Sequence, residues 1–229
     1  KKKQESNDVA LKLVPALQEE LQVLDEEAAM RLAIRFAIAG NIIDYGAFHT
    51  VDLDGMLERC RTTPLAVDDR SSFMQRLDSL DTGAELLYLA DNCGEIVFDN
   101  LLIAKLYKRG LKITVAVKDG PIINDALAAD AYIAGLDRYA DIISNGTRCP
   151  GTVLNEVSER FLDIFNRADL IISKGQGNFE SLSEVDREII FLLTVKCPAA
   201  AKRIHELTGC NKAAVNGAGE MAVFHSSPK

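Results

Sequence analysis

The spacing of hydrophobic and polar positions divides the chain into two parts. Over residues 9–40 apolar side chains recur every three or four positions, which predicts helices that each bury one face. Residues 51–82 also have a helical pattern, interrupted near Pro64. We therefore expect residues 1–82 to form a helical N-terminal part.

Beyond residue 83, short and nearly continuous apolar runs replace the helical spacing. Such runs are typical of strands that are buried on both faces, as in a parallel sheet. They cover residues 85–90, 111–117, 140–144, 169–173 and 188–195. Helical patterns cover residues 96–109, 123–134, 152–167 and 198–208. This alternation predicts an α/β fold: a Rossmann-like three-layer α/β/α body with a mostly parallel sheet at residues 83–229.

Composition narrows the classes of protein that fit this fold. The chain is 48% hydrophobic and 26% charged, which is typical of a globular protein, and its net charge is −8. An acidic chain lacks the basic surface that nucleic acids and membrane surfaces require. None of the five cysteines forms a Cys-x-x-Cys pair, and no apolar leader follows Lys1-Lys2-Lys3-Gln4. We expect a cytoplasmic protein without nucleic-acid or membrane partners, and its oligomeric state stays open.

Polar residues follow the predicted strands at the edge where α/β sheets bind ligands. Asp91 and Asn92 come directly after the first strand, and Asp125 lies in the turn after the second. These side chains offer hard oxygen ligands, which suit Mg²⁺ or Mn²⁺ better than zinc. The sequence therefore predicts a divalent-metal site formed by Asp91, Asn92 and Asp125, which are also the candidate catalytic residues.

Cationic and glycine-rich positions at the same edge suggest that an anion binds beside this metal. Lys118, Lys174 and Lys196 each stand at the end of a predicted strand. Backbone N–H groups of the turn Gly175-Gln176-Gly177, and of the turn at Gly146, can add donors for phosphate oxygens. A metal, carboxylates and lysines at one edge favour phosphoryl chemistry.

Several motifs that follow one another along the chain resemble those of a known family. The motifs are Arg35…Ala39-Gly40-Asn41-Ile42-Ile43-Asp44, Asp91-Asn92-Cys93-Gly94-Glu95, Lys118…Pro121-Ile122-Ile123-Asn124-Asp125, Pro150-Gly151-Thr152 and Ser173-Lys174-Gly175-Gln176-Gly177-Asn178-Phe179-Glu180. Together they resemble the damage-control phosphatases, once described as domain of unknown function 89, and in particular the stand-alone prokaryotic subfamily. The resemblance covers roughly residues 5–215.

This resemblance implies a metal-dependent phosphatase that acts on small phosphorylated metabolites, such as sugar phosphates or damaged relatives of normal intermediates. Asp91, Asn92 and Asp125 match the family's ligands for Mn²⁺, Ni²⁺, Co²⁺ or Mg²⁺. Lys174 with its glycine-rich turn, and Lys196, match positions that hold the substrate phosphate. Further candidates for contacts to the substrate, or for support of the ligands, are Asn41, Asp44, Asn124, Asn145, Gly146, Asn178 and Glu180.

Three questions stay open at this point. The nucleophile is either a water on the metal or the Asp91 carboxylate acting covalently. The same residues also suit a sensor that binds a metal and a sugar phosphate or nucleotide without turnover. A methyltransferase is a more distant alternative. In a methyltransferase we would expect a glycine-rich loop after the first strand, but in this chain Asp91 and Asn92 follow that strand.

Overall fold

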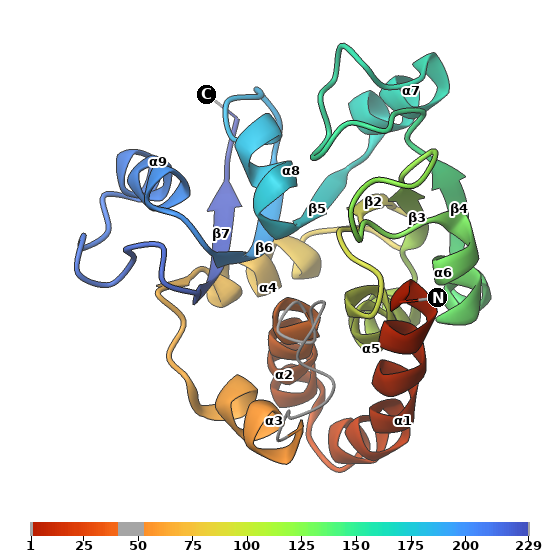
Figure 1. The fold of residues 1–229 in the computed structure, drawn as a ribbon, viewed down its shortest axis with the longest axis vertical. Helices are drawn as coiled ribbons and strands as arrows, with labels where there is room; N and C mark the ends of the chain where they lie inside the picture. Colours follow the sequence, from red (N-terminus) through yellow and green to blue (C-terminus); the bar gives the residue numbers. More distant parts are fainter. Residues whose placement is uncertain (1, 41–52, 229) are drawn as a thin grey trace.

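The computed structural model describes residues 2–40 and 53–228, and a seven-stranded sheet lies at the centre of these residues (Figure 1). The strands are β1 (Val67–Asp68), β2 (Glu85–Leu89), β3 (Lys112–Val117), β4 (Ala140–Ser144), β5 (Leu170–Lys174), β6 (Ile189–Val195) and β7 (Glu220–Ser226). Their order across the sheet is β1-β7-β6-β5-β2-β3-β4. Strands β2 to β6 are parallel, whereas β7 runs antiparallel to β6 and β1 runs parallel to β7.

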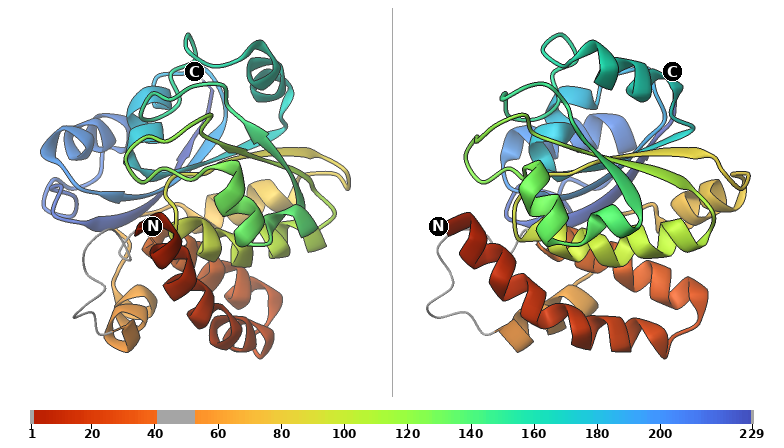
Figure 2. Two further views of the ribbon diagram at one scale, coloured as in Figure 1. Left: turned by 45° about the vertical axis from the view of Figure 1, so that its right-hand side comes forward. Right: turned by 90° about the vertical axis from the view of Figure 1, so that its right-hand side faces the viewer.

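Helices cover both faces of the sheet, which gives the three layers that the sequence predicts (Figure 2). The helices are α1 (Lys2–Gln22), α2 (Glu26–Ala39), α3 (Leu53–Thr62), α4 (Arg70–Asp78), α5 (Glu95–Lys108), α6 (Ala128–Ile133), α7 (Glu159–Arg167), α8 (Gly175–Leu182) and α9 (Pro198–Thr208), with a short 3₁₀-helix at Leu136–Arg138. Helices α1 to α6 belong to one hydrophobic core and α7 to α9 to the other. The predicted fold class is confirmed.

The central strands form where the apolar runs predict them because both of their faces are buried. In β2, Leu86 and Tyr88 enter the core on the side of α5, whereas Leu87 and Leu89 enter the core on the side of α7. Every residue of β6 is buried. Such strands show no polar alternation, which is why their sequence is continuously apolar.

The N-terminal residues share a core with the rest of the chain. Ile34 of α2, Phe98 of α5 and Ile190 of β6 belong to one buried cluster. Strand β1 lies between α3 and α4 in sequence and pairs with β7. The part at residues 1–82, which we expected to be helical, therefore also contributes a short strand. Helix α2 therefore lies beside α5 and also contacts β6 and β7, and α1 packs against α5 (Figure 2).

Two predicted helices are shorter than their patterns suggest, and one helix was not predicted. Residues 123–127 form a loop, and α6 begins after Leu127, whose backbone N–H donates to Asp130 Oδ2. Helix α7 begins after Ser158, whose hydroxyl accepts from the N–H of Phe161, so residues 152–158 are also loop. Helix α8 follows β5 immediately, where only a glycine-rich turn was expected. In the described parts of the chain, no helix has the length and apolar character needed to cross a membrane.

Candidate active site

The candidate site lies where the connections of the parallel strands change direction. From β2 the chain continues to β3 and β4 on one side, whereas β5 and β6 lie on the other side. Strands β2 and β5 are neighbours, and in open α/β sheets the ligand crevice lies beyond the carboxyl ends of two such strands. Asp91 and Asn92 leave β2 at this crevice, and Lys174 and Gly175 leave β5 there.

A short backbone pairing brings the three predicted metal ligands together. The Ala126 N–H donates to the carbonyl of Asp91 at 2.8 Å, and Asn92 and Asp125 form an antiparallel bridge. The segment after β3 thereby lies alongside the exit of β2. This pairing, which the strand pattern did not predict, is what places Asp125 next to Asp91 and Asn92.

The turn before Asp125 contains the one non-glycine residue with positive φ among the described residues. Ile123 has φ of 41°, and its side chain is 79% exposed. A β-branched residue in this conformation is strained, typically by about 1–2 kcal/mol. The Asp125 N–H closes the turn by donating to the Ile122 carbonyl at 3.0 Å. Strain of this kind is concentrated at functional sites, where the surrounding structure maintains it.

The start of α8 lies directly against Asp91. Gly175 has φ of 78°, and a Cβ at this position would collide with the Asp91 carboxylate. Glycine is therefore required here both for its backbone conformation and for the close approach. As a result, the positive N-terminal end of α8 faces a carboxylate, an arrangement that also favours a bound anion.

Negative charge gathers at this crevice with little compensation. Burial raises the pKa of Asp91 well above its usual range, and the nearby carboxylates of Glu95 and Asp125 raise it further. The charges of Lys174 and Lys196 oppose this shift without cancelling it. Two or more buried carboxylates with an unfavourable charge balance are the electrostatic setting that a divalent cation stabilises.

The donor atoms fit a hard cation. Asp91 and Asp125 contribute carboxylate oxygens, and Asn92 can contribute its amide oxygen. Over residues 2–40 and 53–228, no three His, Cys, Asp or Glu side chains are grouped so as to hold a metal. The candidate site therefore depends on Asn92 as the third protein ligand. An all-oxygen set of this size suits Mg²⁺ or Mn²⁺, which keep several waters.

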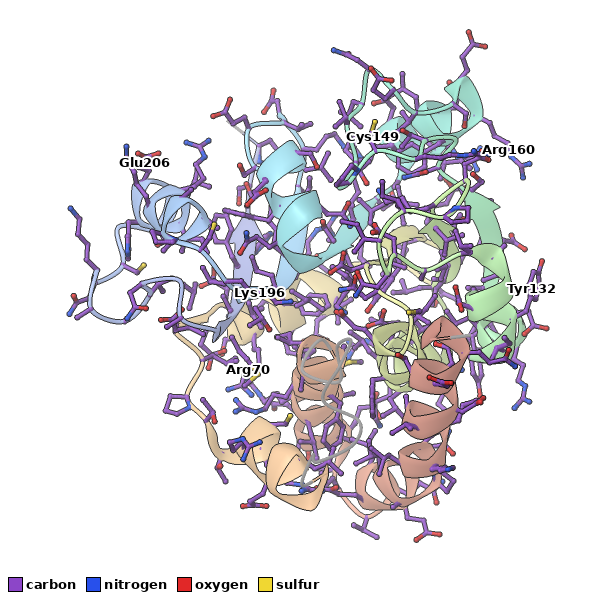
Figure 3. The ribbon with its side chains drawn as sticks, viewed as in Figure 1. Arg70, Tyr132, Cys149, Arg160, Lys196 and Glu206 are labelled. Carbon is purple, nitrogen blue, oxygen red and sulfur yellow. The ribbon has the colours of Figure 1, made fainter. Side chains whose placement is uncertain are left out.

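Two of the three predicted lysines stand at this edge. The Lys118 ammonium is buried, donates to the Gly151 carbonyl and lies 3.9 Å from Asp125 Oδ1. Burial lowers its pKa, against the opposing effect of Asp125. Lys196, which is labelled in Figure 3, follows β6 and is exposed, and its charge acts on Asp91.

The environment of Lys174 is not the one expected for a residue that binds the substrate phosphate. Its side chain is 0% exposed, and its ammonium donates to the Ala37 carbonyl at 2.7 Å, Glu95 Oε1 at 2.5 Å and Asp99 Oδ1 at 2.8 Å. Each of its three N–H bonds thus has an acceptor inside the protein. Burial alone would lower the pKa of Lys174, but the two carboxylates raise it above its ordinary value. Lys174 is therefore the counter-ion of a buried cluster.

Helix α8 contains four further candidates, and its hydrogen bonds give Gln176 and Asn178 a structural role. The buried Asn178 amide donates to the carbonyls of Ala90 and Lys174 and accepts from the Thr152 hydroxyl, so it joins the exits of β2 and β5. The Gln176 amide donates to the exposed Glu180 and accepts from the backbone N–H of Lys196. These bonds hold α8 against the ends of the strands. The sequence had instead suggested that Gln176 and Asn178 contact the substrate. Gly177 lies in the first turn of α8.

The loop after β4 also serves to hold the backbone. Asn145 accepts from the Thr147 N–H at 3.1 Å, in a local turn that buries its side chain. Gly146 has φ of 81°, and a Cβ there would lie 2.6 Å from the Ser158 Cβ. Both residues therefore shape the loop rather than provide an open phosphate cradle. Asn124 is buried beside Asp125, with its carbonyl accepting from the Cys93 N–H. The predicted Asn41 and Asp44 lie outside the described residues.

Two residues at the site had no role in the sequence interpretation. Glu95 begins α5 and accepts from the Asn92 amide as well as from Lys174. Asn7 of α1 accepts from the Gly94 N–H at 2.6 Å and donates to Asp130, so the N-terminal helix supports the loop after β2. Glu95 was detectable as part of a quoted motif, whereas Asn7 lies in the polar run Gln4-Glu5-Ser6-Asn7-Asp8, where nothing in the sequence distinguishes it.

The fold and the site together define a class: α/β proteins that handle phosphate esters at the switch point of a parallel sheet. Residues 1–210 match the family model of the damage-control phosphatase ARMT1-like domain. The chain belongs to this family and is a phosphatase.

Individual relatives agree with this assignment. The chain is 40% identical over 205 residues to the damage-control phosphatase PH1575 of Pyrococcus horikoshii, covering 88% of this chain and 69% of that protein. It is 35% identical over 208 residues to a damage-control phosphatase of Archaeoglobus fulgidus, covering 88% of this chain and 70% of the relative. The crystal structure of the Pyrococcus horikoshii family member superposes with a TM-score of 0.81 at 36% identity, over 98% of this chain and 73% of that one. A mouse 4′-phosphopantetheine phosphatase is 26% identical over 144 residues, covering 58% of this chain and 17% of that protein.

Proposed function

We propose that this phosphatase hydrolyses phosphomonoesters of small metabolites, such as sugar phosphates or damaged intermediates, with a divalent metal bound by Asp91, Asn92 and Asp125. The observation that carries the proposal is the backbone pairing that brings Asp125 beside Asp91 and Asn92. Burial, and after it the carboxylates of Glu95 and Asp125, raise the pKa of Asp91 at this place. The names of its damage-control relatives and of the mouse 4′-phosphopantetheine phosphatase support the substrate class.

The bound metal would supply Lewis-acid stabilisation of charge on phosphate oxygens. Around it, this chain's own residues hold the phosphate group in place. Lys196 is exposed at the edge and can reach an anion, and the N-terminal end of α8 at Gly175 offers backbone N–H donors. Lys118 lies deeper and adds positive charge 3.9 Å from Asp125. Together these groups would stabilise charge that builds on the oxygens during phosphoryl transfer.

Two nucleophiles fit this arrangement: a water molecule, or the Asp91 carboxylate acting covalently. Covalent attack would form an aspartyl phosphate on Asp91, which is a mixed anhydride, and release the alcohol. Water would then hydrolyse the anhydride to inorganic phosphate and regenerate the carboxylate. Rapid quenching during turnover of a ³²P-labelled substrate separates the two routes. Label that stays with the denatured protein supports the covalent route, and its absence at quench times shorter than one turnover supports direct attack by water.

We further propose that the protein functions in a reducing compartment, the cytoplasm. None of the five cysteines, all of which lie in the described part of the chain, forms a disulfide. Five cysteines without a disulfide are typical of proteins that function under reducing conditions.

The test is phosphate release from p-nitrophenyl phosphate and a panel of sugar phosphates, with each of Mn²⁺, Ni²⁺, Co²⁺ and Mg²⁺ and with EDTA. Wild type is compared with Asp91→Ala and with Asp137→Ala, a control that removes an exposed carboxylate from the short 3₁₀-helix. We expect metal-dependent release that Asp91→Ala abolishes and Asp137→Ala retains. Release that persists in EDTA, or in folded Asp91→Ala protein, would contradict the proposal.

A further inference from the structure

The direction of the Asn92 side chain decides whether it can bind a cation. An asparagine amide has an oxygen, which binds metal ions, and a nitrogen, whose protons are donors only. In the structure Asn92 Nδ2 donates to Asp91 Oδ2 at 2.8 Å and to Glu95 Oε2 at 3.2 Å. Both acceptors are carboxyl oxygens. The nitrogen is therefore the end of the Asn92 amide that faces Asp91 and Glu95.

The position of Glu95 is itself fixed by its contacts. It is buried at the start of α5, and its Oε1 accepts from Lys174 at 2.5 Å. Lys174 also donates to Asp99 on the next turn of α5 and to the Ala37 carbonyl at the end of α2. One carboxylate oxygen of Glu95 thus binds its counter-ion, and the other is directed at Asn92. This is how a residue beyond the metal ligands orients one of them.

We propose that Glu95 is a positioning residue that turns the Asn92 amide oxygen toward the metal, with Lys174 holding Glu95 in place. The inference rests on the proposed metal site at Asp91, Asn92 and Asp125. It also gives Lys174 a role in place of the phosphate contact expected from the sequence: the lysine acts through Glu95 and does not touch the substrate.

The test uses two isosteric variants of the same buried cluster. In Glu95→Gln, a single oxygen must serve both Lys174 and Asn92, so one bond is lost or the Asn92 amide turns over. In the control Asp99→Asn, the oxygen at the Oδ1 position still accepts from Lys174 and from the Tyr88 hydroxyl. The Oδ2 atom of Asp99 has no hydrogen-bond partner among the described residues, so the amide nitrogen replaces no bond. Both variants remove one charge near Lys174, but only Glu95 touches Asn92.

The readout is the Kd for Mn²⁺, measured on the metal-free protein by the electron paramagnetic resonance signal of free Mn²⁺. We expect Glu95→Gln to weaken Mn²⁺ binding by about 10–100-fold, the usual effect of losing a group that orients a ligand. Asp99→Asn should bind Mn²⁺ within about threefold of wild type, since it changes the stability of the cluster and not the direction of Asn92. Raising Mn²⁺ should restore much of the turnover of Glu95→Gln.

Each outcome either supports or overturns the inference. Equal Mn²⁺ affinity in wild type and folded Glu95→Gln would overturn it, and so would an equal loss in both variants. If wild type itself binds no Mn²⁺, the proposed metal site fails, which distinguishes that failure from a failure of the positioning role alone. If Glu95→Gln does not fold, Glu95→Asp replaces it: this variant keeps the charge beside Lys174 but is too short to reach Asn92. Wild-type affinity in Glu95→Asp would overturn the inference.

Discussion

Two groups of carboxylates lie side by side in this protein, and they differ in how closely they are paired with a cationic side chain. Glu95 and Asp99 both accept hydrogen bonds from the Lys174 ammonium, which is fully enclosed. Beyond the end of β2, Lys118 is 3.9 Å from Asp125, and no ion pair is found for Asp91 among the described residues. The first group is fixed in the core by its shared counter-ion, and the second is paired less closely. This difference separates the carboxylates that maintain the fold from those that we propose hold a cation.

The largest expected effect comes from removing the compensation in the first group. Lys174→Met leaves two buried carboxylates without a counter-ion, which typically costs about 3–5 kcal/mol. We expect a variant that is unfolded or whose free energy of unfolding, measured with urea, falls by that amount. Wild-type stability in Lys174→Met would show that the lysine is not the counter-ion of this cluster.

In the second group, removal of a charge should have the opposite effect on stability. Asp91→Asn eliminates a carboxylate whose pKa is raised by burial and by Glu95. We expect the metal-free protein to become more stable at pH 7, because the substitution removes a charge that the folded state disfavours. Phosphate release should be lost in the same variant. A less stable Asp91→Asn would mean that the charge of Asp91 is compensated in the folded protein.

Protonation of the buried carboxyl groups should stabilise the wild-type protein, as the Asp91→Asn substitution does. A carboxyl whose pKa is raised in the folded state binds more protons there than in the unfolded chain, so folding becomes less favourable as pH rises. Asp91, Glu95 and Asp99 all have raised pKa values because they are buried. We expect the metal-free protein to become more stable as the pH is lowered from 7 toward 5, measured by urea unfolding. A stability that falls steadily over this interval would contradict the raised values.

Metal should remove part of this pH dependence, which sharpens the comparison. A ligand at 100 times its Kd stabilises the folded state by about 2.7 kcal/mol if it does not bind the unfolded chain. With saturating Mn²⁺ the gain should be largest near pH 7, where the Asp91 carboxylate is needed in its charged form. The gain in stability from Mn²⁺ is measured by thermal unfolding with and without Mn²⁺ at pH 5 and at pH 7. An Mn²⁺ effect that is larger at pH 5 would contradict the assignment.

The smallest effect is expected at the strained turn beside Asp125. Ile123→Gly relieves the positive φ but makes the unfolded chain more flexible, and these contributions offset each other. The exposed side chain contributes little burial. We expect the free energy of unfolding to stay within about 1 kcal/mol of wild type, with at most a tenfold change in turnover. A loss above 2 kcal/mol would show that Ile123 packs against something essential.

The sequence predicted the parallel strands well because their burial leaves a continuous apolar run. It missed β7, which lies beyond the alternating pattern and pairs antiparallel to β6. It missed α8 because Gly175-Gln176-Gly177 is typical of a turn, and the helix there depends on packing against the exits of β2 and β5. These features are decided by contacts between distant segments, which local spacing does not reveal.

The same limit applies to the site. The rule that ligands bind beyond strand ends predicted that Asp91, Asn92 and Asp125 would lie together, and the structure places Asn92 and Asp125 in one bridge. It gave no information on which way each side chain turns. Lys174 ends β5 as predicted, but its ammonium is directed into the core toward α5, because Glu95 and Asp99 stand one turn apart on the helix face that it meets.

The most direct test of the central claim is phosphate release by one preparation before and after its metal is removed and returned. The protein is treated with EDTA, dialysed, assayed with p-nitrophenyl phosphate, and assayed again after Mn²⁺ is added. The account predicts that release is lost on stripping and returns with about one Mn²⁺ bound per chain, as expected for a site with three protein ligands. Full activity in the stripped protein would contradict the proposal that Asp91, Asn92 and Asp125 hold a catalytic cation.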